Sequence, residues 1–144
     1  MLHEYIAQVS EIIFAPASKV WEALVTPSII KKYFFGTNAE SDWEVGSPIT
    51  FSGEMDGNTY EDKGIILAIE LGAMLKYSYW SSLSGIEDKS ENYVDITYEV
   101  KEHEGKTMIT VSQENIPSEK MKQHAIETWT KVVKNLKELL EQDN

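Results

Sequence analysis

The sequence contains no cysteine and no arginine, and these two absences exclude several functions at the outset. Without cysteine the chain forms no disulfide, offers no thiol nucleophile and builds no cysteine-based metal site. Without arginine it lacks the planar side chain that binds phosphate or carboxylate through two parallel hydrogen bonds. The 13 basic residues are therefore all lysine, against 24 acidic residues, and the formal net charge is −11. A surface of this sign repels nucleic acid and anionic lipid, so we expect neither as a partner.

Long apolar runs are missing as well. No stretch approaches the roughly 20 residues that a membrane-spanning helix needs, so we expect no membrane insertion. The first residues, MLHEYIAQVSEII, lack the basic start and apolar segment of a signal peptide, and we expect a cytoplasmic protein. The 144 residues, 42% of them hydrophobic, suit a single domain over residues 1–144 with an ordinary core.

Motifs for catalysis, metals and nucleotides are also lacking. The segment SLSG at 82–85 lacks the first glycine of a G-x-S-x-G nucleophile elbow. There is no H-E-x-x-H, no glycine-rich phosphate loop and no EF-hand pattern. The acidic run EDKSE at 87–91 lies in an expected loop, where a solvated surface is a commoner role than a calcium site. We therefore expect no metal and no cofactor.

What the sequence does contain is a series of alternating apolar segments typical of an antiparallel sheet. Strands are predicted at 4–14, 43–55, 59–71, 75–80, 93–100 and 107–113. The dipeptide Asp56-Gly57 between two of these segments indicates a tight hairpin. Such strands have one apolar face, and that face needs a cover.

Helical periodicity appears in two places. In KVWEALVTPSIIKKYF at 19–34, two short apolar stripes meet at Thr26 and Pro27, which predicts two short helices with a corner between them. After Ser118 the period changes to 3.6 for the rest of the chain, which predicts one long helix. Its apolar stripe comprises Met121, Ala125, Trp129, Val132, Val133, Leu136, Leu139 and Leu140. At roughly 35 Å this helix exceeds an eight-residue strand of about 27 Å, so it must cross the sheet diagonally.

Five segments follow one another between residues 15 and 141: APASKVWEALVTPSIIKKYF, WEVGSPITF, GIILAIELGAMLKYSYW, TYEVKEHEGKTMITVSQENI and HAIETWTKVVKNLKELLE. Together they resemble the AHSA-like branch of the SRPBCC superfamily, also called START-like or birch-pollen-allergen-like. The resemblance implies an α+β helix-grip fold. In it a curved antiparallel sheet of about six to seven strands wraps around the long C-terminal helix, with two short helices between strands one and two. It also implies a cavity between sheet and helix.

The sequence departs from the family pattern at the walls of that cavity. Tyr33 stands where the family usually has tryptophan, Tyr79 occupies a second tryptophan-like position, and Thr128 replaces a common glycine. The two short helices would close the open end of the curled sheet. In this interpretation Trp21 and Leu24 anchor them, while Tyr33, Phe34 and Phe35 reach toward the interior.

We expect aromatic and flexible apolar side chains to line the cavity. Phenol and indole groups can orient a ligand by hydrogen bonds while their rings bury its apolar part. The expected lining residues are Tyr33, Phe34, Trp43, Phe51, Met55, Tyr60, Tyr77, Tyr79, Tyr98, Met121, Ala125 and Trp129. The alternative is that these side chains only fill the core, with the methionines closing gaps.

Three functions follow from this interpretation. The first is non-enzymatic binding of a small, largely apolar molecule, lipid-like or aromatic. The second, implied by the resemblance, is a protein-interaction module with a role in the stress response, because the family takes its name from an activator of the heat-shock chaperone ATPase. That activator's separate N-terminal domain is not part of this sequence, so a chaperone partner is less expected. We expect a monomer or a weak homodimer.

The third function is enzymatic, since some relatives in the superfamily are cyclases or hydrolases. Here it would depend on cavity tyrosines and His124 as acid–base groups, with Glu22 or Glu114 as carboxylate partners. A partly exposed helix histidine is the commoner role for His124. His3 and His103 lie near a terminus and a turn, where solvent exposure is expected. The sequence thus favours a protein without catalytic activity.

Overall fold

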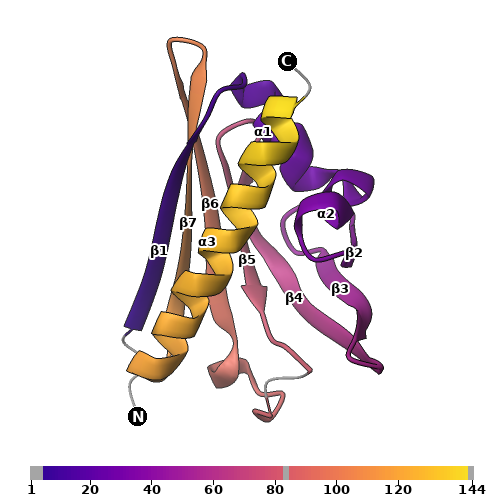
Figure 1. Cartoon of the computed structure of the whole chain (residues 1–144). Helices are drawn as coiled ribbons and strands as arrows, with labels where there is room; N and C mark the ends of the chain where they lie inside the picture. Colours follow the sequence, from indigo (N-terminus) through magenta and orange to yellow (C-terminus); the bar gives the residue numbers. More distant parts are fainter. Residues whose placement is uncertain (1–4, 83–84, 143–144) are drawn as a thin grey trace.

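The computed structural model describes residues 5–82 and 85–142, apart from the side chain of Met55. Within these residues, seven strands form one antiparallel sheet accompanied by three α-helices (Figure 1). The elements are β1 (Tyr5–Ile13), α1 (Ala17–Val25), α2 (Pro27–Tyr33), β2 (Asn38–Ser41), β3 (Pro48–Met55), β4 (Asn58–Glu70), β5 (Met74–Tyr79), β6 (Val94–His103), β7 (Lys106–Ile116) and α3 (Glu119–Gln142), with a short 3₁₀ helix at Ser90–Asn92. The strand order is β1-β7-β6-β5-β4-β3-β2. The predicted helix-grip fold is confirmed.

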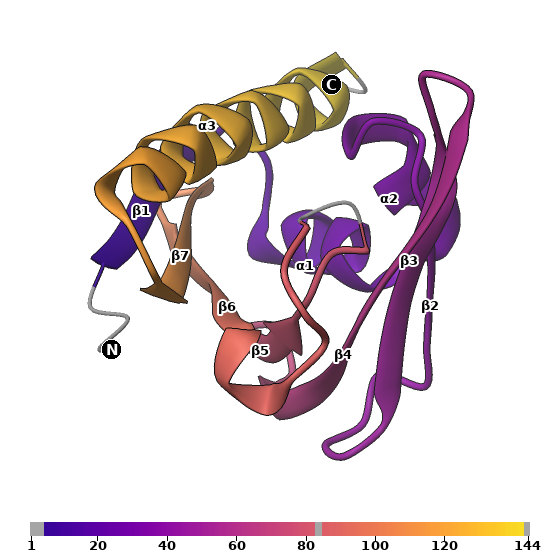
Figure 2. The same cartoon turned by 90° about the horizontal axis from the view of Figure 1, so that it is seen from below.

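The long helix α3 crosses the sheet diagonally (Figure 1), as its length required. Seen from below, the sheet curls and α3 lies across its open side, packed mainly on β1 and β7 (Figure 2). The helix begins after Ser118, whose hydroxyl oxygen accepts the Met121 N–H at 3.2 Å, as an N-cap does. Its buried side chains are Ala125, Trp129, Val132, Val133, Leu136 and Leu140.

The two short helices α1 and α2 meet at the predicted corner. Thr26 holds the N-cap position of α2 in an extended conformation, although its side chain makes no capping bond, and Pro27 follows in the first turn. The Tyr33 hydroxyl donates to the Ala23 carbonyl at 2.9 Å and fixes the angle between the helices. The Asn135 amide donates to the Tyr33 carbonyl at 3.3 Å and ties the pair to α3.

The region before β3 differs from the prediction. The expected strand at 43–55 begins only at Pro48, because residues 43–47 form a turn in which the Gly46 N–H donates to the Ile66 carbonyl at 2.8 Å. The sheet gains an edge strand instead, β2, whose sequence NAES carries no alternating apolar pattern. The hairpin at Asp56 and Gly57 is confirmed: both have positive φ, 51° and 82°, as a two-residue type I′ turn requires.

Candidate functional site

A cavity of about 730 Å³ lies under α3, bounded by the sheet, by the end of α2 and by the segment that follows β5. Sites for small molecules usually measure about 300–1,000 Å³ and have mainly apolar walls with a few polar groups. The walls here fit that description. The lining residues are Phe34, Phe35, Thr37, Phe51, Tyr60, Asp62, Tyr77, Tyr79, Trp80, Ser81, Ile86, Asn92, Val94, Ile96, Gln113, Ile116, Met121, His124, Ala125, Thr128, Trp129 and Lys131.

A continuous set of aromatic rings forms one wall. The Phe34 and Phe51 rings stack with centroids 6.1 Å apart and an interplanar angle of 21°. The Phe51 ring also contacts Tyr77 at 5.7 Å and Tyr79 at 5.9 Å. The Trp129 ring meets Phe34 edge-on at 5.7 Å, so the contacts run from the sheet to the helix. Rings packed against one another keep their orientation, and this wall is therefore preformed.

Trp129 is held by a polar contact as well. Its indole N–H donates to the Gln113 side-chain oxygen on β7 at 2.8 Å. A buried indole N–H needs such a partner, because leaving it unpaired carries a desolvation penalty. The bond fixes the ring that α3 contributes to the cavity and joins the helix to the sheet at the same point.

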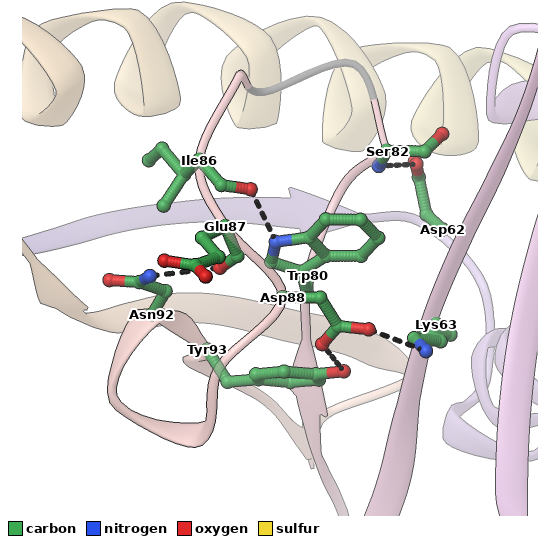
Figure 3. Close-up of polar contacts among 9 residues, drawn as sticks. All are labelled: Asp62, Lys63, Trp80, Ser82, Ile86, Glu87, Asp88, Asn92 and Tyr93. Atoms are coloured by element: carbon green, nitrogen blue, oxygen red, sulfur yellow. Dashed lines mark hydrogen bonds and ion pairs between the residues drawn. The ribbon is translucent and has the colours of Figure 1, made fainter.

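The most deeply buried acidic group of the cavity is Asp62 on β4, whose residue is 7% exposed. One carboxylate oxygen accepts the Tyr79 hydroxyl at 2.5 Å. The other accepts the Ser82 backbone N–H at 3.0 Å (Figure 3). Burial, and secondly the negative charge of Asp62, raise the pKa of the Tyr79 hydroxyl far above its ordinary value. Tyr79 therefore remains a protonated donor to Asp62 at any physiological pH.

The position of Asp62 in the cavity wall is set by the pairing of β4 with the end of β5 and the residue that follows it. Residues 63 and 80 exchange two backbone hydrogen bonds, of 3.0 and 2.8 Å, beyond the regular end of β5. Next to this bridge the Cα of Gly64 lies against the Ser78 carbonyl, so closely that a Cβ on Gly64 would stand 1.6 Å from the Ser78 oxygen. Only glycine allows the two strands to approach in this way.

The described residues between β5 and β6 line one side of the cavity and make several polar contacts (Figure 3). The Trp80 indole N–H donates to the Ile86 carbonyl at 3.0 Å. Asp88 accepts the Tyr93 hydroxyl and the Lys63 ammonium, each at 2.7 Å. The hydrogen bond from Lys63, followed by that from Tyr93, lowers the pKa of the Asp88 carboxyl.

Exposed apolar side chains line the cavity at the turn after α2 and in the first turn of α3. Phe35 and Met121 line it although they are 53% and 39% exposed, so they form an apolar rim. Phe35 adopts a positive φ of 52°, which is uncommon for a bulky residue. Phe35 thus stands at the entrance, whereas we expected it in the interior.

Eight of the twelve expected lining residues border the cavity: Phe34, Phe51, Tyr60, Tyr77, Tyr79, Met121, Ala125 and Trp129. Three others, Tyr33, Trp43 and Tyr98, lie outside this lining and surround a gap of about 10 Å³ behind it. That gap has room for at most one water molecule. The side chain of the twelfth, Met55, lies outside the described part of the structure.

Asp62 is the main residue that we did not predict. Its inward position could have been predicted from that of Tyr60, because side chains two residues apart on a strand share a face and Tyr60 was expected to face inward. Gln113 on β7 was missed for the same reason, since we selected only aromatic and apolar side chains as lining residues and it is a polar residue on an inward face. Trp80 was missed because alternation in the predicted strand at 75–80 puts it on the face opposite Tyr77 and Tyr79, and Ile86 was missed because it follows in a segment without regular periodicity.

The acid–base combination considered for catalysis is not assembled. His124 is exposed at the rim, and in the described part of the chain no carboxylate lies within hydrogen-bonding distance of its imidazole. Glu22 and Glu114 are exposed and do not line the cavity.

Among the residues described, no cluster of three metal-ligating side chains occurs. No helix in this part of the chain is long and apolar enough to cross a membrane.

Comparisons with known proteins agree with this architecture. The sequence profile of the family described as Activator of Hsp90 ATPase homolog 1-like protein matches residues 14–141. A Cytophaga hutchinsonii protein of known solution structure is 41% identical, with 99% of this chain and 97% of that chain covered and a TM-score of 0.85. None of the curated proteins matches the chain.

Two further solved structures share the fold at lower identity. An HSP90 activator from Plasmodium falciparum is 19% identical over 94% of this chain and 96% of that chain, with a TM-score of 0.73. The Aha1 dimer from Colwellia psychrerythraea is 17% identical over 95% of this chain and 96% of that one, also with a TM-score of 0.73. At these identities the likeness is one of fold.

Proposed function

This chain belongs to the family of Activator of Hsp90 ATPase homolog 1-like proteins, and from that premise we propose that it binds a small, largely apolar ligand under α3 without transforming it. The observation that carries the proposal is the cavity of about 730 Å³ with a preformed aromatic wall. A core that only stabilised the fold would be packed far more closely, since protein interiors leave few voids larger than a water molecule. The expected catalytic combination of His124 with Glu22 or Glu114 is not assembled, and this supports binding over catalysis.

The proposal explains why the chain keeps large rings around an open space. Aromatic side chains lose little conformational freedom when they bind, and their contacts with one another hold them in place before a ligand arrives. Phe51, Tyr77 and Tyr79 present such a surface from the sheet, and Trp129 presents it from the helix. The exposed apolar rim at Phe35 and Met121 provides an entry path.

Binding can be tested with N-phenyl-1-naphthylamine, a neutral apolar dye whose fluorescence rises in apolar surroundings. We expect saturable binding to the wild-type protein with one dye per chain. Ala125→Phe places a ring inside the cavity and should weaken binding about tenfold or more, since it occupies the space that the dye needs. Thr130→Phe, on an exposed position of the same helix, is the matched control and should bind as the wild type does.

Two results would overturn the proposal. The first is the absence of saturable dye binding to the folded wild-type protein. The second is equal binding by Ala125→Phe and the wild type, because the dye would then sit elsewhere on the surface. Circular dichroism of each variant establishes that it is folded before binding is compared.

A second candidate function is interaction with an Hsp90-type chaperone, favoured by the family description and by the fold shared with an HSP90 activator. It is tested by adding the protein to purified Hsp90 and measuring ATP hydrolysis. Stimulation would support this function, and an unchanged rate together with no retention in a pull-down would exclude it.

A weak homodimer, suggested by the fold shared with the Aha1 dimer, is tested by light scattering over a range of concentrations.

A further inference from the structure

The carboxylate of Asp62 is an unusual group to find in the wall of an apolar cavity. The residue is 7% exposed, and among the described residues its hydrogen-bond donors are the Tyr79 hydroxyl and the Ser82 backbone N–H. Both donors are neutral. The two oxygens of an ionised carboxylate together offer about four acceptor positions, so about two remain for another donor.

No cation of the protein pairs with this carboxylate in the described part of the chain. The neighbouring Lys63 lies on the other face of β4, because successive side chains of a strand point to opposite faces. Its ammonium is bonded to Asp88 instead (Figure 3). A buried charge is costly unless it is hydrogen-bonded and paired, so a ligand that lies against Asp62 is favoured when it supplies a hydrogen-bond donor with a positive charge.

Lys131 and His124 on α3 also line the cavity, but the nearest neighbours of Asp62 favour a positive group over a neutral or negative one. Phe51 stands directly opposite Asp62 in the β3–β4 register, and the Tyr79 ring lies 5.9 Å from Phe51. Aromatic faces attract cations through their quadrupole. A negative group would meet both the Asp62 charge and a protein whose formal net charge is −11.

We propose that Asp62 selects ligands that carry a protonated amine on an apolar, preferably aromatic, body. The ammonium donates to the free acceptor positions of the carboxylate, and the body packs on the rings of the cavity wall. This inference rests on the proposed function, since it names the ligand class of the same cavity. It adds that the ligand carries a positive charge, which the cavity volume and the apolar walls do not require.

The test uses three probes that share one ring system and differ in charge: 2-naphthylmethylamine, 2-naphthylmethanol and 2-naphthoic acid. Their affinities are measured at pH 7.5 by displacement of N-phenyl-1-naphthylamine and by titration calorimetry. We expect the amine to bind about tenfold or more tightly than the alcohol, the usual advantage of a hydrogen bond between charged groups, and the acid to bind weakest. An alcohol or acid that binds the wild type as tightly as the amine overturns the inference.

Asp62→Asn tests whether the preference comes from this carboxylate. We expect the amine and the alcohol to bind this variant about equally. Glu61→Gln is the matched control, because it removes the same charge from the next residue of β4, which is exposed and outside the cavity. This variant should keep the wild-type preference. A preference that survives in Asp62→Asn, or disappears equally in Glu61→Gln, shows a general effect of net charge and overturns the inference.

Tyr79→Phe provides a second variant if Asp62→Asn does not fold. It removes a neutral donor from Asp62, so the carboxylate depends more on the ligand and the preference for the amine should rise. An unchanged or smaller preference in Tyr79→Phe overturns the inference in that case. Failure of the dye itself to bind the wild type would overturn the proposed function, whereas dye binding without amine preference overturns only the role given to Asp62.

Discussion

The hydroxyl groups of Tyr77 and Tyr98 lie 2.9 Å apart on the neighbouring strands β5 and β6, in the buried space between the sheet and the helices. Each ring also contacts the other, with centroids 5.9 Å apart. Burial raises the pKa of both phenols well above the ordinary value, so both remain protonated and one donates to the other. Tyr77 faces the cavity while Tyr98 lies behind it, and the pair therefore joins the cavity wall to the core.

This pair predicts a non-additive response to mutation. Tyr98→Phe leaves the Tyr77 hydroxyl without its partner and should lower the free energy of unfolding by about 1–3 kcal/mol. Tyr77→Phe should have a similar effect. The double variant removes both polar groups together, so we expect it to lose less than the sum of the two single losses. Urea denaturation followed by fluorescence measures all four proteins, and strictly additive losses would show that the two hydroxyls do not depend on each other.

A second prediction concerns the close approach of β4 and β5. Gly64→Ala would bring a Cβ to 1.6 Å from the backbone oxygen of Ser78, so the strands must separate, and we expect a loss of about 1–3 kcal/mol in unfolding free energy. Gly53→Ala is the matched control. There the Cβ meets the tip of the Tyr60 side chain at 2.8 Å, and a side chain can move where a backbone cannot. Thermal unfolding should rank Gly64→Ala well below Gly53→Ala; equal midpoints would contradict the explanation.

The sequence was sufficient to predict most of the elements because they carry strong local signals, whereas their helix-grip arrangement was implied by the family resemblance. The Asp56-Gly57 turn, the corner at Thr26 and Pro27, and the apolar stripe ending at Leu140 each reflect interactions between near neighbours. The short strand β2 could not be predicted this way. Its residues Asn38–Ser41 have no apolar pattern and become a strand only because β3 offers them a free edge.

The cavity was harder to predict than the fold for a related reason. Alternation tells which side chains face inward, and it placed Phe51, Tyr77 and Tyr79 correctly on that side. It does not tell which inward side chains touch open space and which touch one another, as Tyr98 does. That distinction depends on how far α3 stands from each strand, which is a property of the whole packed molecule.

A third prediction concerns pH and the contact between Lys63 and Asp88. Because bonds from Lys63 and Tyr93 lower the pKa of the Asp88 carboxyl, it should titrate below the ordinary value of about 3.9 when followed by NMR. The contact stabilises the folded chain above that ordinary value, and its contribution is lost as the pH falls through the lowered pKa. Lys63→Gln should move the Asp88 titration upward. Lys89→Gln, which affects the separate contact of Lys89 with Glu87, should leave it in place; equal shifts in both variants would contradict the assignment.

The last prediction concerns Trp129, whose ring contacts and hydrogen bond hold α3 against the sheet. Trp129→Ala removes a buried ring that touches Phe34 and Tyr98 and should lower the unfolding free energy by about 3–5 kcal/mol. Trp129→Phe keeps a ring in this place and loses chiefly the bond to Gln113, so urea denaturation should show a clearly smaller loss. The dye N-phenyl-1-naphthylamine should still bind the folded Phe variant, since the other rings of the wall remain. If both substitutions destabilise the protein equally, the bond to Gln113 rather than the ring contacts holds the helix on the sheet.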